Sequence, residues 1–144
     1  MGEDRTVIYI SSLLSEEQDI SLQEYFCRKY CKENNLNNIQ ICVEIGKENI
    51  VLKKIFSNLY KYTHLVTYSV CTFGNCHSDI LHYVDAILKT NTELSCVLFP
   101  INKGMLSYFS GPNQAFVKTT LIGSAIHFNE TMKEVIDYKL KHIS

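Results

Sequence analysis

Two kinds of apolar pattern alternate along this chain, and their alternation constrains its fold more than any other feature. Short runs rich in β-branched residues suit buried strands, and such runs lie at residues 7–10, 39–45, 65–70 and 95–99. Apolar residues spaced three or four apart, typical of helices, follow each run, at residues 15–33, 52–59, 80–88 and 113–142. Because parallel neighbouring strands need a crossover connection, this order predicts an α/β fold with a mostly parallel sheet.

The chain has 144 residues, 46% of them apolar, which fits one domain with a sizeable core. We divide it into an α/β core at residues 1–112 and a long terminal helix at 113–144. Residues 104–112 are expected to form a loop or a short fifth strand. The terminal helix is too long to bury its whole length against its own core, so we expect its apolar stripe to meet a partner. The stripe contains Val117, Leu121, Ala125, Phe128 and Met132.

The formal net charge is −1, so the chain has no surplus of positive charge with which to displace counterions from nucleic acid. Strong DNA binding of its own is not expected. Lysines 53, 54 and 61 form a modest basic patch, which we interpret as a solvated helical face. No signal core or membrane-spanning apolar run is present in the sequence, and a soluble, cytoplasmic protein is expected.

Six cysteines are expected to be reduced, because two of them lie inside strand-like runs where a thiol acts as a small apolar group. Cys27 and Cys31 are four apart on a predicted helix and should pack on one face. Cys71, Cys76 and His77 lack the spacing of a zinc site. We expect no metal and no cofactor.

Two segments carry a resemblance to a known family. Residues 9–18, read Tyr-Ile-Ser-Ser-Leu-Leu-Ser-Glu-Glu-Gln, are followed by Ser21-Leu22-Gln23. They resemble the opening of the serine recombinase (resolvase and invertase) family, roughly Y-A-R-V-S-T-x-x-Q and then S-L-x-x-Q. Residues 66–75 are similar to the family's third strand and its L-D-R-L-G-R motif, with Gly74 kept. The resemblance implies a resolvase-like three-layer domain, with a sheet of four to five strands between helices and a long dimerisation helix.

The resemblance also implies a chemistry for which this chain lacks the expected residues. Such enzymes use a serine to attack a DNA phosphodiester, and arginines stabilise the charge that develops on the phosphate. The sequence has only two arginines, Arg5 and Arg28. On alignment, the family's catalytic positions fall on Ser11, Leu13 (or Leu14, counted back from Gln18), Asn49, Cys71, Thr72 and Asn75. On the last helix, Phe128 and Asn129 stand at the positions of an acid and an arginine.

Three hypotheses follow. The first is a pseudo-recombinase, not an enzyme, that acts by association as a homodimer or as a heterodimer with a recombinase-like protein. It would lack the DNA-binding module that the family carries after its long helix. The second is an active site-specific recombinase with a relocated nucleophile, Ser12 or Ser11. The third is a small-ligand sensor at the open end of the sheet, around Ser11, Ser12, Cys71 and Asn75.

Overall fold

The computed structural model describes the backbone of residues 4–12, 18–98 and 101–141, and the side chains of these residues except 18, 19, 132, 133 and 135–141. Four strands form one parallel sheet in the order β2-β1-β3-β4. They are β1 (Thr6–Ser11), β2 (Ile39–Glu44), β3 (His64–Thr67) and β4 (Glu93–Cys96). This confirms the prediction of an α/β fold with a parallel sheet.

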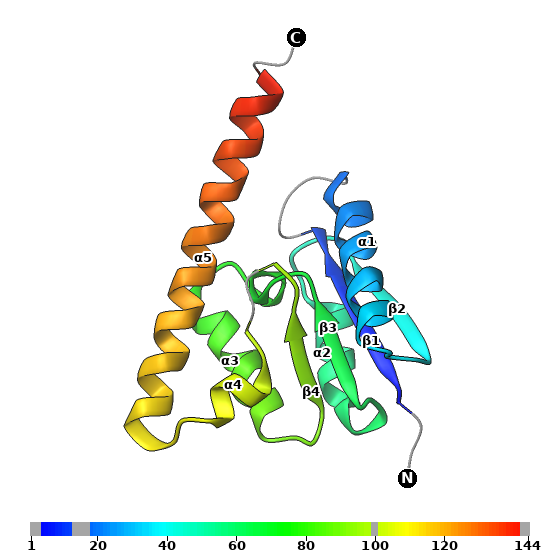
Figure 1. Cartoon of the computed structure of the whole chain (residues 1–144), viewed down its shortest axis with the longest axis vertical. Helices are drawn as coiled ribbons and strands as arrows, with labels where there is room; N and C mark the ends of the chain where they lie inside the picture. The colour runs from blue at the N-terminus through cyan, green and yellow to red at the C-terminus, as the bar shows by residue number, and fades with distance from the viewer. Residues whose placement is uncertain (1–3, 13–17, 99–100, 142–144) are drawn as a thin grey trace.

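Helices cover both faces of the sheet and make three layers (Figure 1). Helix α1 (Gln18–Glu33) packs on one face, where Cys27 and Cys31 are buried against Ile8 and Ile10 of β1, as their shared helical face predicts. Helices α2 (Ile50–Ser57) and α3 (His77–Leu88) pack on the other face. Strand β1 is buried on both faces because its alternate side chains enter two cores.

The third and fourth strands were predicted with the wrong bounds, and the fourth spans Glu93–Cys96 instead of residues 95–99. The third strand ends at Thr67 instead of residue 70, because Ser69 starts a 3-10 turn, η3 (Val70–Phe73). The Ser69 hydroxyl accepts a hydrogen bond from the Cys71 backbone N–H at 3.1 Å, and this turn packs its apolar residues into the core. The apolar run at residues 65–70 therefore reflects burial and not extended strand.

The expected loop or fifth strand at residues 104–112 is instead a short helix, α4 (Lys103–Ser107). Asn102 caps it, because its Oδ1 accepts a hydrogen bond from the Met105 N–H at 2.7 Å. Asn102 forms an isolated antiparallel bridge with Ser95 of β4. Within the described ranges the sheet therefore has four strands. A second short turn, η2 (Leu59–Lys61), links α2 to β3.

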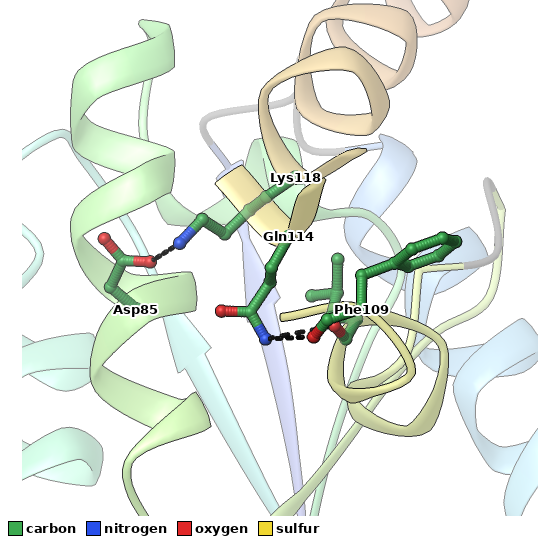
Figure 2. Close-up of polar contacts among 5 residues, drawn as sticks. Asp85, Phe109, Gln114 and Lys118 are labelled. Carbon is green, nitrogen blue, oxygen red and sulfur yellow. Dashed lines mark hydrogen bonds and ion pairs between the residues drawn. The ribbon is translucent and has the colours of Figure 1, made fainter. Parts of the chain in front are cut away.

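The longest helix is α5 (Gly111–Lys141), close to the predicted 113–142. Its first half packs on the core through Ile122 and Ala125, which are each 1% exposed. Polar contacts fix the same half: Lys118 pairs with Asp85 of α3, and the Gln114 amide donates to the Phe109 carbonyl oxygen at 3.1 Å (Figure 2). At 1.5 Å per residue the 31-residue helix is about 46 Å long, and its second half projects beyond the core (Figure 1).

In the part of the chain that the structure covers, no helix has the length and apolar character needed to span a bilayer.

Candidate functional site

The predicted site residues gather where the strands of the sheet end. Ser11 closes β1, the turn η3 follows β3, and Asn49 comes directly before α2. The Asn49 side-chain amide donates to the Phe73 carbonyl oxygen at 3.3 Å, which joins the start of α2 to η3. The carboxyl ends of parallel strands are where α/β proteins bind ligands. The residues that lie together at the carboxyl ends of the strands, which we call the carboxyl edge, are Ser11, Ser12, Asn49, Cys71 and Thr72. Leu13 and Leu14 lie outside the described residues.

Ser11 is fully buried and held by a side chain from α1. Its backbone N–H donates to Gln23 Oε1 at 3.2 Å, and its carbonyl oxygen accepts from Gln23 Nε2 at 2.9 Å. Gln23 is itself 1% exposed. The two bonds form a closed pair between a buried amide and the end of β1. They fix the backbone where the strand leaves the sheet. Gln23 belongs to the segment Ser21-Leu22-Gln23, on which part of the family resemblance rests.

Ser12, the alternative nucleophile, is half-buried at the same edge. Its hydroxyl oxygen accepts a hydrogen bond from the Gly46 backbone N–H at 3.0 Å, so it ties the end of β1 to the loop after β2. This contact has a structural effect, because it joins two neighbouring strand ends. It also leaves the hydroxyl proton available for a second partner.

The residues at the position of the family's Asp-Arg pair are turned into the protein. Thr72 is fully buried, and its hydroxyl lies 2.7 Å from the Thr67 hydroxyl and 2.7 Å from the Ser69 carbonyl oxygen. Cys71 is 7% exposed. Asn75, in contrast, is exposed after the turn. Thr72 thus serves a buried hydroxyl network at the end of β3 and not a surface that meets solvent.

A buried carboxylate that the sequence analysis missed lies at the centre of this edge. Glu44 is 3% exposed and ends β2. It accepts three hydrogen bonds: Oε1 from the Leu52 N–H at 2.9 Å and the Tyr9 hydroxyl at 3.1 Å, and Oε2 from the Val51 N–H at 3.1 Å. The negative charge suits the positive end of α2. Glu44 therefore occupies the N–H groups that a bound anion would use.

Tyr9 shows how closed this region is. Its side chain is fully buried, and burial together with the neighbouring Glu44 raises the pKa of its hydroxyl well above the usual range. A hydrogen bond with the Ser11 side chain acts in the opposite direction. The hydroxyl is therefore a permanent donor to Glu44 at neutral pH. A clue was present in sequence, because an acid ends a strand that otherwise carries no charge.

Both arginines lie away from this edge. Arg5 is exposed and precedes β1, at the opposite end of the sheet. Arg28 lies on α1 and forms an ion pair with Glu24, one turn earlier, at 3.0 Å. No cluster of three His, Cys, Asp or Glu side chains suited to a metal ion occurs among the residues that the structure describes.

Comparison with known proteins identifies the fold. The sequence matches no family model and no curated protein. Two solved structures are similar over almost the whole chain, each with 15% identity and a TM-score of 0.56. One is the N-terminal catalytic domain of TP901-1 integrase, with 92% of this chain and 98% of that chain covered. The other is a resolvase family site-specific recombinase from Streptococcus pneumoniae, with 96% and 97% covered.

The chain has a resolvase-like fold. The similarity in structure at such low identity concerns the path of the backbone and the order of the elements. It agrees with the fold that the sequence resemblance implies, including the long last helix. At the carboxyl edge of this resolvase-like fold lie the buried Glu44 carboxylate, the buried Thr72 hydroxyl and the exposed Asn75. Both arginines lie elsewhere.

Proposed function

We propose that this chain is a resolvase-fold protein without strand-exchange chemistry, which acts by association through α5. The observation that carries the proposal is the Glu44 carboxylate on the first N–H groups of α2. A phosphodiester entering this edge would meet a buried carboxylate in place of free donors. Two like charges 4 Å apart near a protein surface repel by about 4 kcal/mol.

The neutral residues around Glu44 support the same view. Phosphoryl transfer depends on cations placed where charge develops, and loss of one such donor costs about a hundredfold or more in rate. Ser11 and Thr72, at two of the arginine positions that the resemblance implies, have short side chains that are fully buried. Arg28 forms an ion pair with Glu24, and Arg5 is at the far end of β1.

A cytoplasmic location stays a prediction from sequence.

The partner surface that we propose lies on α5. Ile122 and Ala125 face the core, so Ala125 of the predicted stripe is used within the chain, and Leu121 also packs against the core. A groove of about 560 Å³ runs along another face. It is lined by Thr119, Thr120, Gly123, Ser124, His127, Phe128 and Thr131. This groove and the projecting half of the helix form the surface offered to a second copy or to a recombinase-like protein.

Gly123 provides a sharp test. A side-chain carbon built at this glycine meets no atom within 4 Å, so Gly123→Glu leaves the isolated chain undisturbed but fills the groove. Sedimentation velocity of the full chain should show a dimer whose dissociation constant rises by about tenfold or more in this variant. Ser21→Glu, which adds the same charge to an exposed position of α1, should leave association unchanged.

A wild-type chain that sediments as a monomer at every concentration, alone and when mixed with an active recombinase, would contradict the association proposal. An equal loss of dimer in both variants would also contradict it, because the effect would then come from net charge and not from the groove.

The second candidate is an active recombinase with Ser12 or Ser11 as nucleophile. The half-buried Ser12 hydroxyl at the carboxyl edge favours it. This hypothesis predicts a covalent protein–DNA adduct that disappears in Ser12→Ala. It also predicts that a cation supplied by a partner reaches the phosphate.

A further inference from the structure

We infer that the open edge of β2, with the groove between β2 and α2, binds an extended acidic peptide segment of a partner protein, which adds a strand to the sheet. This inference is independent of the function proposed above, because it concerns the opposite side of the molecule from α5. It is based on three features: an unprotected strand edge, an apolar groove beside it, and a local surplus of positive charge.

The edge is open and carries apolar side chains. Strand β2 pairs with β1 on one side, and the described residues place no strand on its other side. Ile39 is 37% exposed and Val43 is 39% exposed, while Ile45, just after the strand, is 70% exposed. Proteins usually protect such an edge with lysine, proline or a bulge. The sequence of β2, Ile-Gln-Ile-Cys-Val-Glu, has no lysine or proline.

A groove of about 500 Å³ runs beside this edge, between β2 and α2. Cys42, Val51 and Ile55 contribute apolar surface to it, and Lys54 and Lys61 contribute the charged groups. A strand added along β2 would direct every second side chain towards this groove, because side chains alternate between the two faces of a sheet. The remaining side chains would pack near Ile39 and Val43 on the other face.

The charge of the groove indicates the chemistry of the partner. None of the residues that line it is acidic, although the whole chain has a net charge of −1. The Lys61 ammonium lies 5.9 Å from the centre of the Tyr60 ring, and Tyr60 is 76% exposed. Lys53 is exposed beside Lys54. Acidic side chains at alternate positions of the added strand would therefore meet these lysines.

A peptide fits these features better than nucleic acid does. Main-chain hydrogen bonds to a sheet edge give an added strand its affinity, and side-chain pockets give it specificity. A phosphate backbone would use the lysines but would gain nothing from Val43, Val51 or the open strand edge. The observations together therefore favour strand addition by an acidic peptide.

Fluorescence anisotropy with the full chain tests the inference. The probe is a labelled peptide, Glu-Val-Asp-Ile-Glu-Val-Asp, in which acidic and β-branched residues alternate. One control peptide has lysine in place of each acid, and another keeps the acids but carries N-methyl groups on alternate backbone nitrogens. Lys54→Glu combined with Lys61→Glu alters the groove. Lys29→Glu combined with Lys89→Glu makes the same change in net charge at exposed positions of α1 and after α3.

We expect the acidic probe to bind the wild-type chain, with affinity that falls as salt screens the lysines. The groove variant and the N-methylated peptide should each weaken binding by about tenfold or more, and the matched variant by less than about twofold. Gly123→Glu should leave peptide binding unchanged, which separates this inference from association through α5.

Three results would overturn the inference. Equal losses in the two charge-reversed variants would mean that the probe senses net charge alone. Full binding of the N-methylated peptide would mean an anion site without strand addition. Displacement of the probe by a short DNA duplex that binds more tightly, and whose binding also depends on Lys54 and Lys61, would identify a nucleic-acid surface instead.

Discussion

Replacement of Glu44 tests whether its carboxylate satisfies the buried donors at the carboxyl edge of the sheet. Glu44→Ala removes the acceptor for two backbone N–H groups of α2 and for the Tyr9 hydroxyl, all in a position where Glu44 is 3% exposed. A buried donor left without a partner costs about 1–3 kcal/mol. Because water can enter the space left by the shorter side chain, we take the lower end for each donor. The expected loss in the free energy of unfolding is about 3 kcal/mol or more.

Glu44→Gln should have a smaller effect. Its amide oxygen replaces one carboxylate oxygen, but its NH₂ group would face a donor where the other oxygen accepted. One donor therefore loses its partner, together with the favourable charge at the start of α2, and we expect a loss of about 1–3 kcal/mol. Each loss is a measurable fraction of the stability of about 5–15 kcal/mol that is typical of a native protein.

Urea denaturation followed by circular dichroism measures these free energies. Glu48→Gln is the matched control, because Glu48 is exposed in the same β2–α2 connection. It should change the free energy of unfolding by less than about 0.5 kcal/mol. If Glu44→Ala were as stable as Glu48→Gln, the carboxylate would not be satisfying buried donors, and the argument that it excludes an anion from α2 would fail.

Three further predictions follow from other contacts. Burial raises the pKa of the Tyr9 hydroxyl above its usual value of 10.0, so this group ionises at a lower pH in the unfolded chain than in the folded one. The free energy of unfolding should therefore fall as the pH rises above 10.0. Urea titrations across that range should show a shallower fall for Tyr9→Phe. Burial raises the pKa of the Cys27 thiol to about 12, so iodoacetamide at neutral pH should modify exposed Cys76 and leave Cys27 intact by mass spectrometry; modification of both at one rate would contradict this. A double-mutant cycle on Lys118→Ala and Asp85→Ala should give a coupling free energy of about 0.2–1 kcal/mol, because the Asp85 side chain is 40% exposed. A coupling of zero would mean that this ion pair does not help to hold α5 on the core.

The sequence predicted the alternation of strands and helices because burial imposes a periodicity on each element. Strand β1 and helix α5 were located to within two residues for this reason. The third strand was predicted too long, since an apolar run indicates burial without distinguishing a strand from a 3-10 turn. Helix α4 depends on a cap from Asn102 and on packing around Leu106, which spacing alone did not indicate.

The site was predicted in part. Motif order placed Ser11, Asn49, Cys71 and Thr72 near one another, and the structure brings them to one edge. Glu44 was missed because its role depends on a contact between the end of β2 and the start of α2. The local clue, an acid at the end of an otherwise uncharged strand, does not by itself indicate that contact. Whether an acid at a strand end is solvated or buried depends on the elements around it, which here supply the Tyr9 hydroxyl from β1 and two N–H groups from α2.

We propose that the carboxyl edge of this sheet does not accept a phosphodiester. Titration of the isotopically labelled chain with dimethyl phosphate, a minimal phosphodiester, tests it directly through the NMR resonances of the Ser11, Val51, Leu52 and Thr72 amides. We predict that these four resonances stay in place while Glu44 holds the start of α2. Saturable shifts of the Val51 and Leu52 amides in the wild-type chain would contradict the claim.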